Sequence, residues 1–164
     1  MNPLKNEKYA RLAVVAGLIV VADQISKEMV QRFIPLYHSI SVIPGCFNLT
    51  HIHNPGGAFG FLAGQSPQLR QVIFIFASSL AIGLIFYFYR STPRRFVALS
   101  FGFSLIFGGA IGNLIDRLRF GKVVDFLDAY LGTLHWPAFN VADSAITVGI
   151  GIFLFHLIFQ KLPE

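Results

Sequence analysis

The segment Val72–Tyr89, VIFIFASSLAIGLIFYFY, decides the fold class of this chain. It carries no charge over nearly the roughly 20 residues that an α-helix needs to cross about 30 Å of hydrocarbon. The segments Phe96–Ile115 and Ser144–Gln160 are also free of charged residues. A further apolar run starts at Leu12 and continues with helical spacing to Phe33. We therefore predict an all-α integral membrane protein with four transmembrane helices, at about residues 12–33, 71–89, 96–115 and 142–160.

The composition supports a membrane environment and excludes an ordinary soluble domain. The chain is 54% hydrophobic and 13% charged, whereas an average soluble domain has roughly 25% charged residues. A net charge of +5 could suggest nucleic-acid binding, but the cations lie at the ends of the apolar runs. They are better interpreted as topology signals, and no nucleic-acid partner is expected. The single cysteine, Cys46, excludes an internal disulfide and is interpreted as a packing residue.

The amino-terminal apolar run has an alternative interpretation as a cleaved signal peptide. Basic residues precede it, and Val20 with Ala22 fits the small-residue cleavage pattern. However, the helical pattern continues past Ala22 and three further spans follow. We therefore predict that the first span is retained.

The distribution of lysine and arginine predicts the orientation. A slight excess, which includes the dense turn Arg90–Arg95, favours both termini in the cytoplasm. Residues 34–69 and 116–140 are then the outer segments, and both are longer than simple hairpins require. The β-branched alternation of Ser39–His53 predicts short strands in the first of them. The glycines within Phe107–Gly112 predict close contact between helices.

Polar residues that a bilayer would resist all fall near the outer face of this predicted topology. They are Asp23, Lys27, Asn54, Asn113, Asp116, Arg117, Asp125, Asn140 and Asp143. Structural polar residues would not be expected to share one leaflet, so the convergence indicates a functional site.

Several of these residues also have purely structural interpretations. Asn140 could cap a helix with Asp143 at its third position. Asp23 and Lys27 could form a self-contained helical pair, and Arg117 could reach for lipid headgroups. Asp125 is harder to explain in this way, because it stands between two large apolar residues.

Two carboxylates that share a proton can divide an acid role from a base role. The ionised member can activate water, and the protonated member can polarise a peptide carbonyl. Such a site needs amide or guanidinium donors, and Asn54, Asn113, Asn140 and Arg117 are of this type. It needs no metal, and the five histidines lack the spacing of a zinc protease. His51 and His53 are expected on a strand.

These residues belong to five blocks that resemble the bacterial lipoprotein signal peptidase (signal peptidase II) family along nearly the whole chain. The blocks are Asp23-Gln24-Ile25-Ser26-Lys27, Asn54-Pro55-Gly56-Gly57-Ala58-Phe59, Gly108 to Arg117, Val124-Asp125-Phe126, and Phe139-Asn140-Val141-Ala142-Asp143. Their order, with four spans between them, makes the match specific.

The resemblance implies a single membrane-embedded peptidase domain, residues 1–164, in the bacterial inner membrane. It implies four helices with a periplasmic β-cradle and a short periplasmic helix. Asp125 and Asp143 would be the catalytic dyad, and the supporting or substrate-binding residues would be Asp23, Asn54, Gly56, Asn113, Arg117 and Asn140. The substrates would be prolipoproteins, cut before a cysteine that bears diacylglyceryl. Globomycin would inhibit the enzyme; no cofactor or metal is implied, and a monomer is expected.

Two other classes of function remain open from the residues alone. Intramembrane carboxylates also occur in transporters and proton paths, although charges crowded at one face argue against a path through the membrane. A non-enzymatic assembly factor would tolerate replacement of the aspartates by alanine.

Overall fold

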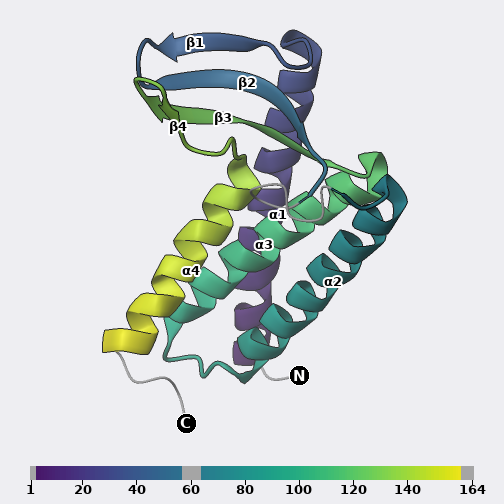
Figure 1. The fold of residues 1–164 in the computed structure, drawn as a ribbon. Helices are drawn as coiled ribbons and strands as arrows, with labels where there is room; N and C mark the ends of the chain where they lie inside the picture. The colour runs from purple at the N-terminus through teal and green to yellow at the C-terminus, as the bar shows by residue number, and fades with distance from the viewer. Residues whose placement is uncertain (1–2, 57–63, 160–164) are drawn as a thin grey trace.

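Four helices and a small sheet form the molecule, with the sheet at one end of the helix bundle (Figure 1). The computed structural model describes residues 3–56 and 64–159, with side chains from residue 7 onwards. The helices are α1 (Pro3–Phe33), α2 (Pro67–Ser91), α3 (Val97–Phe120) and α4 (Val141–Phe159). All four are long and apolar enough to cross a membrane. The predicted four-span membrane fold is therefore confirmed.

The helix ends differ from the predicted spans for identifiable reasons. Helix α1 begins at Pro3 rather than near Leu12, because charged residues limit burial in lipid but not helix formation. It also continues without a break through Ala22. Helix α2 begins at Pro67, where Ser66 accepts a hydrogen bond from the N–H of Leu69 and proline occupies the first position.

Helix α3 extends beyond its predicted end at Ile115. It ends at Phe120, where Gly121 adopts the left-handed conformation with φ of 71° and its N–H bonds to the carbonyl of Arg117. Asp116 and Arg117 therefore lie on α3, where the sequence had placed these two polar residues, although the bounds given for the outer segment 116–140 overlap the end of the helix.

The sheet joins parts of the two predicted outer segments. Strands β1 (Ser39–Ile43), β2 (Phe47–Asn54), β3 (Val123–Leu131) and β4 (Leu134–His135) pair in that order, each antiparallel to the next. The prediction of strands within Ser39–His53 is confirmed, and His51 and His53 lie on β2. The sequence did not predict β3.

The outer segments contain an exposed cysteine. Cys46 lies in the turn between β1 and β2 and is exposed, so its interpretation as a packing residue was wrong. The described parts of residues 34–69 and 116–140 contain no separate short helix. Residues 57–63 lie outside the described residues, and with them Gly57, Ala58 and Phe59 of the second block.

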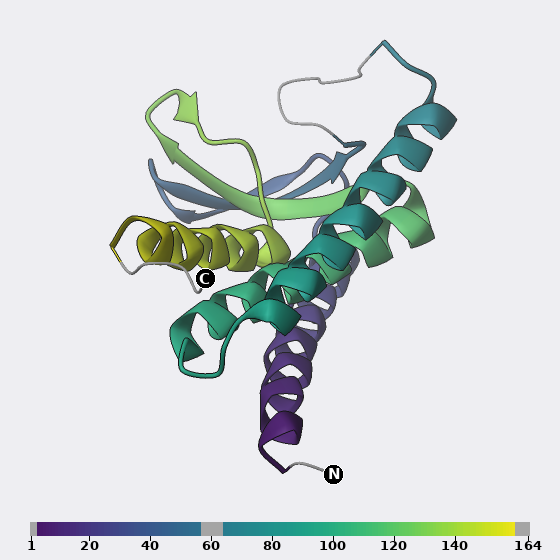
Figure 2. The same cartoon turned by 90° about the horizontal axis from the view of Figure 1, so that it is seen from below.

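Helix α3 is the central element, because it packs against each of the other three helices (Figure 2). Its glycines allow this packing, as predicted. A Cβ atom on Gly109 would lie 2.4 Å from the carbonyl oxygen of Ala142 on α4. The first turn of α4 therefore lies directly against α3, at the level of Asp143.

We expect Gly109→Ala to lower the free energy of unfolding by about 1–3 kcal/mol, because the added methyl group meets backbone that cannot rotate away. Gly151→Ala on α4 is the control, since nothing lies within 4 Å of a Cβ at that position. Unfolding by SDS titration in mixed micelles measures both variants. Equal stability of the two variants would contradict the close packing.

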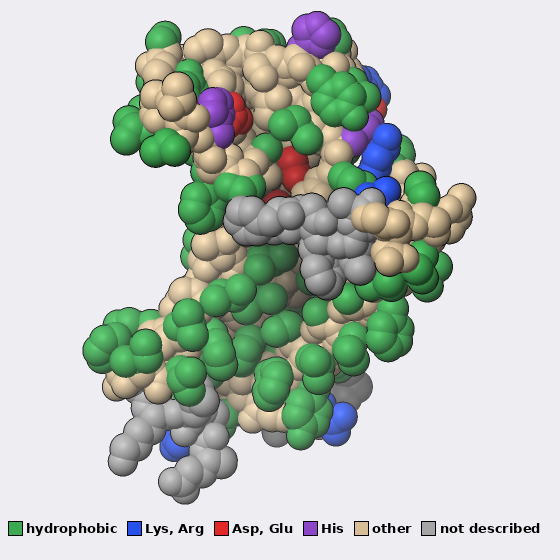
Figure 3. All heavy atoms as spheres, in the orientation of Figure 1, with side chains coloured by type: hydrophobic (Ala, Val, Ile, Leu, Met, Phe, Trp, Pro, Cys, Tyr) green, Lys and Arg blue, Asp and Glu red, His purple; other side chains and the backbone are tan. Residues whose placement is uncertain are grey.

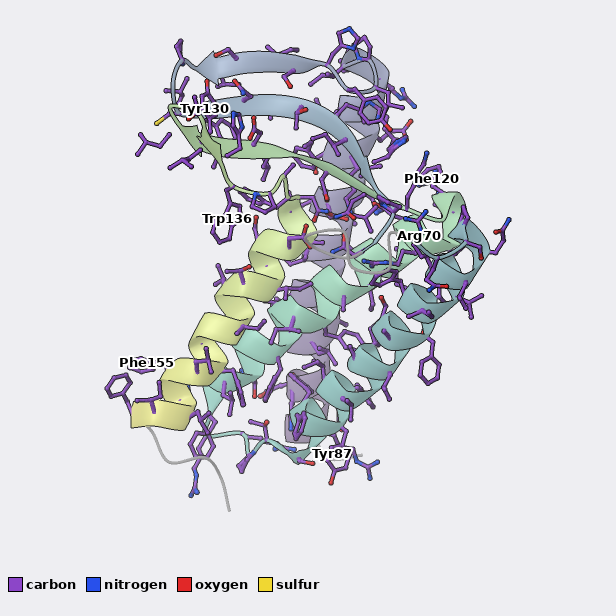
Figure 4. The ribbon with its side chains drawn as sticks, viewed as in Figure 1. Arg70, Tyr87, Phe120, Tyr130, Trp136 and Phe155 are labelled. Atoms are coloured by element: carbon purple, nitrogen blue, oxygen red, sulfur yellow. The ribbon has the colours of Figure 1, made fainter. Side chains whose placement is uncertain are left out.

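Exposed aromatic residues mark both ends of the bundle (Figure 4). Trp136 lies at the sheet end and is 69% exposed, whereas Tyr87 at the opposite end is 62% exposed. Tryptophan and tyrosine favour the two membrane–water interfaces. The helices between them therefore have the flanking residues expected of a membrane-spanning bundle.

Candidate active site

Asp125 lies on β3, next to β2 and to Asn140, the residue that precedes α4. Its neighbours Val124 and Phe126 are buried, and Asp125 itself is 3% exposed. One carboxylate oxygen accepts a hydrogen bond from Asn54 Nδ2 on β2 at 2.9 Å, and the other accepts one from Asn140 Nδ2 at 2.7 Å. The buried carboxylate is thus held from two sides by amide donors.

Asp143 lies in the first turn of α4. Asn140 caps this helix, as the structural interpretation of the sequence predicted. The Asn140 side-chain oxygen accepts a hydrogen bond from the Asp143 N–H at 2.9 Å, and Asp143 Oδ2 accepts one from the Asn140 N–H at 3.3 Å. The remaining oxygen, Oδ1, accepts a bond of 2.7 Å from Asn113 Nδ2. The capping interaction therefore uses Oδ2 of Asp143, and Oδ1 of Asp143 faces Asn113 on α3.

A pair of asparagines links the two carboxylates. Asn140 Nδ2 contacts Asn113 Oδ1 at 3.2 Å, and each asparagine also donates to one aspartate. Asp125 and Asp143, distant along the chain, are therefore connected through Asn140 alone by two hydrogen bonds and through Asn140 and Asn113 by three. Figure 3 shows acidic side chains in the hollow between the sheet and the helices.

The environment of Asp125 favours its protonated form. Burial is the largest cause, and the nearby Asp143 adds to it; together they raise the pKa of Asp125 to about 6. Hydrogen bonds from Asn54 and Asn140 and the charge of Lys27 oppose this shift. Asp125 thus keeps a proton to a higher pH than a free carboxyl group does.

A second buried network adjoins these residues on the side of α1. Lys27 forms ion pairs with Asp23 at 2.8 Å and with Asp116 at 2.9 Å, and all three side chains are at most 2% exposed. Asp23 Oδ1 also accepts a hydrogen bond from the N–H of Ala142 at 3.0 Å. The pairing of Asp23 with Lys27 is thus not self-contained, because it ties α1 to both α3 and α4.

From the sequence, Lys27 and Asp116 were grouped with the polar residues near the outer face but were given no supporting role, and Gln24 was not in that group. Asp116 was set apart because it lies one position off the Asn113–Arg117 face. Asn113 and Asp116 are three apart, however, and such residues are also neighbours on a helix. Gln24 Nε2 donates to Asp116 Oδ1 at 2.8 Å. The signal that could have identified Gln24 is the one that identified the other two residues, namely a polar group inside an apolar helix.

Two other candidates lie at the edge of the site. Gly56 donates its N–H to Asn54 Oδ1 at 2.9 Å, with φ of 105°, and so fixes the amide that holds Asp125. Arg117 donates to the carbonyl of Asn113 at 3.2 Å, and its guanidinium lies 5.7 Å from the centre of the Phe74 ring. Among the described residues, no hydrogen bond joins Arg117 to either aspartate.

Within residues 3–56 and 64–159, no group of three or more histidine, cysteine, aspartate or glutamate side chains is arranged to hold a metal ion. The polar partners of the two aspartates are instead amides and backbone groups. Such donors suit a site where protons move between carboxylates and water.

The fold and the site together define a multi-pass membrane protein with paired carboxylates at one end of its helix bundle. The family model described as signal peptidase (SPase) II matches residues 15–159. The chain therefore belongs to the signal peptidase II family, and the resemblance found in the sequence is confirmed.

Individual relatives agree with this family. The chain is 56% identical to a lipoprotein signal peptidase of Desulforapulum autotrophicum over 154 residues, covering 94% of this chain and 95% of the relative. It is 44% identical to that of Syntrophus aciditrophicus over 151 residues, covering 92% and 93%. A solved bacterial membrane enzyme, determined by the in meso method at 2.3 Å resolution, superposes with a TM-score of 0.81. That enzyme is 30% identical and covers 93% of this chain and 92% of its own.

Proposed function

We propose that this protein is an aspartic endopeptidase that removes signal peptides from prolipoproteins by cutting before the diacylglyceryl-modified cysteine. Family membership supports a peptidase for lipoprotein signal peptides. The observation that carries the aspartic mechanism is the pair of carboxylates, Asp125 and Asp143, linked by Asn113 and Asn140.

In this mechanism the two aspartates have different starting roles. Asp143, at the positive end of α4, is the carboxylate that takes a proton from the attacking water. Asp125 carries the proton that hydrogen-bonds to the peptide carbonyl as the tetrahedral intermediate forms. When the intermediate collapses, Asp143 gives its proton to the leaving amine and Asp125 recovers its own. Asn54 and Asn140 hold Asp125, and Asn113 holds Asp143.

The location of the site suits a substrate anchored in a membrane. The sheet end of the bundle would face the periplasm of a bacterial inner membrane, with both termini in the cytoplasm. A signal peptide crosses the bilayer, and its lipidated cysteine lies at the outer interface. A dyad at this depth meets the scissile bond while the acyl chains stay in lipid. The protein would act as a monomer, and globomycin would inhibit it.

The test is cleavage of a diacylglyceryl-modified prolipoprotein by the purified protein in detergent with EDTA present. We expect full activity under chelation, with mass spectrometry showing a new amino terminus at the lipidated cysteine. A matched substrate without diacylglyceryl should remain uncut. Loss of activity under EDTA that added metal restores would contradict the metal-free mechanism, and a cut elsewhere would contradict the proposed specificity.

The structure gives no particular support to the alternative functions. The described buried ion pairs lie at the sheet end, whereas the other end of the bundle holds an apolar cluster that includes Leu12, Leu99 and Phe103. Proton flux in proteoliposomes that Asp143→Asn abolishes would support a proton path. Full function of aspartate-to-alanine variants would support an assembly factor.

A further inference from the structure

Lys27 is fully buried and has three acceptors for its three N–H groups. Its ammonium lies 2.8 Å from Asp23 Oδ2, 2.9 Å from Asp116 Oδ2 and 3.1 Å from Asn113 Oδ1. An ammonium group can only donate hydrogen bonds. The third contact therefore requires that the oxygen of the Asn113 amide, and not its nitrogen, faces Lys27.

This requirement sets the direction in which Asn113 donates. Asn113 Oδ1 also accepts from Asn140 Nδ2, so two donors converge on it. If the amide turned over, its NH₂ group would face both of these donors. With the oxygen held in place, the NH₂ group points to Asp143 Oδ1 at 2.7 Å. The two faces of an amide are otherwise nearly equivalent in shape, so a fixed donor is needed to choose between them.

We propose that Lys27 is a positioning residue for the reaction: its ammonium locks the Asn113 amide so that an N–H is presented to Asp143. This inference rests on the proposed function, since it assigns a role towards the dyad. The ion pairs with Asp23 and Asp116 hold the ammonium itself in place, and the pair with Asp116 joins α1 to α3. Lys27 thus acts on Asp143 through Asn113 and does not contact the substrate.

A simpler role must be separated from this one. Lys27 could serve the fold alone, by neutralising two buried carboxylates. Lys27→Met removes the charge with little change in side-chain shape, but it leaves Asp23 and Asp116 without their cation. Adding Asp116→Asn restores the net charge that these three side chains have in the wild type.

The experiment is a cycle of four proteins: wild type, Lys27→Met, Asp116→Asn and the double variant. The double variant carries the same net charge as the wild type in these three side chains, and we expect its kcat to be roughly 10- to 100-fold below that of the wild type with KM changed less than about 2-fold, as for a mispositioned catalytic group. If the double variant has the kcat of the wild type, Lys27 serves only as a counter-charge and the proposal is overturned.

A second measurement does not depend on activity. NMR of ¹⁵N-labelled protein in detergent micelles follows the side-chain NH₂ of Asn113, assigned by its loss in Asn113→Ser. We expect one set of signals in the wild type, and a second set or a changed pattern in the double variant. Unchanged Asn113 signals would overturn the proposal, whereas full activity of Asp125→Asn would overturn the dyad and leave the NMR result standing.

Arg32→Met is the matched control for both measurements. Arg32 lies on the same helix and pairs with Glu28 at 2.8 Å, but the two side chains are 69% and 47% exposed. Exposed pairs of this kind contribute little. We expect Arg32→Met to have the kcat and the Asn113 signals of the wild type. If Arg32→Met changes them as Lys27→Met does, then loss of any cation from α1 is sufficient, and the proposed role of Lys27 is contradicted.

Discussion

Replacing Asp125 or Asp143 with asparagine is expected to lower the rate of prolipoprotein cleavage by at least about 1,000-fold while the protein remains folded. Asparagine matches aspartate in size but can neither take a proton from water nor give one to the leaving amine. The measurement is single-turnover cleavage of the lipidated substrate, with the unfolding midpoint recorded for each variant. Substantial turnover by either variant would contradict the dyad.

Asp128→Asn is the matched control for this prediction. Asp128 lies on the same strand as Asp125, but its carboxylate pairs with His135 at 2.8 Å and accepts from Asn48 at 2.8 Å. It is not part of the hydrogen-bond chain that links Asp125 to Asp143. We expect cleavage within about 2-fold of the wild type. A loss equal to that of Asp125→Asn would indicate damage to the sheet and not to the chemistry.

Replacing Asn140 should separate its two roles. Its oxygen caps α4 and its Nδ2 donates to Asp125, and the side chain is fully buried. Asn140→Ser keeps an oxygen that can cap the helix, but it removes the amide donor. We expect this variant to stay within about 1 kcal/mol of wild-type stability and to lose cleavage by about 100-fold, the usual cost of one lost donor in a site.

Asn140→Ala is the comparison, because it removes both the cap and the donor. We expect a similar loss of cleavage together with a loss of about 1–2 kcal/mol of stability from the missing cap. Stability comes from denaturant or SDS titration, and activity from the same cleavage assay. If Asn140→Ser retains wild-type cleavage, then the amide donor to Asp125 has no part in the reaction.

The parts of the fold that follow from local chemistry were predictable from the sequence. Charge-free runs long enough to span lipid identified the helices, and alternation between Ser39 and His53 identified strands in the first outer segment. The exact helix ends were not predictable from hydropathy, because a helix ends where its backbone finds a cap. The glycine at position 121 and the serine at position 66 are such caps, and neither changes the apolar pattern.

The sequence predicted which residues belong to the candidate site better than it predicted the contacts between them. Polar residues in an apolar chain identified Asp125, Asp143 and the asparagines that contact them. The sequence could not show that β3 lies next to β2, which brings Asn54 to Asp125, since strand pairing over such a separation depends on the tertiary fold. For the same reason, the involvement of Lys27 with α3 became visible only when α1 and α3 were placed together.

In the proposed mechanism, the ionisation of Asp125 depends on the charge of Asp143, so the two carboxylates titrate as a coupled pair. Infrared spectroscopy of the protonated carboxyl band gives the titration midpoint of Asp125 when the spectrum is compared with that of Asp125→Asn. Burial and the nearby charge of Asp143 raise the pKa of Asp125 to about 6. Asp143→Asn removes the neighbouring negative charge, so that ionisation of Asp125 costs less and the midpoint should move to lower pH. A midpoint that stays unchanged in Asp143→Asn would show that the two carboxylates do not interact, and would contradict a shared proton.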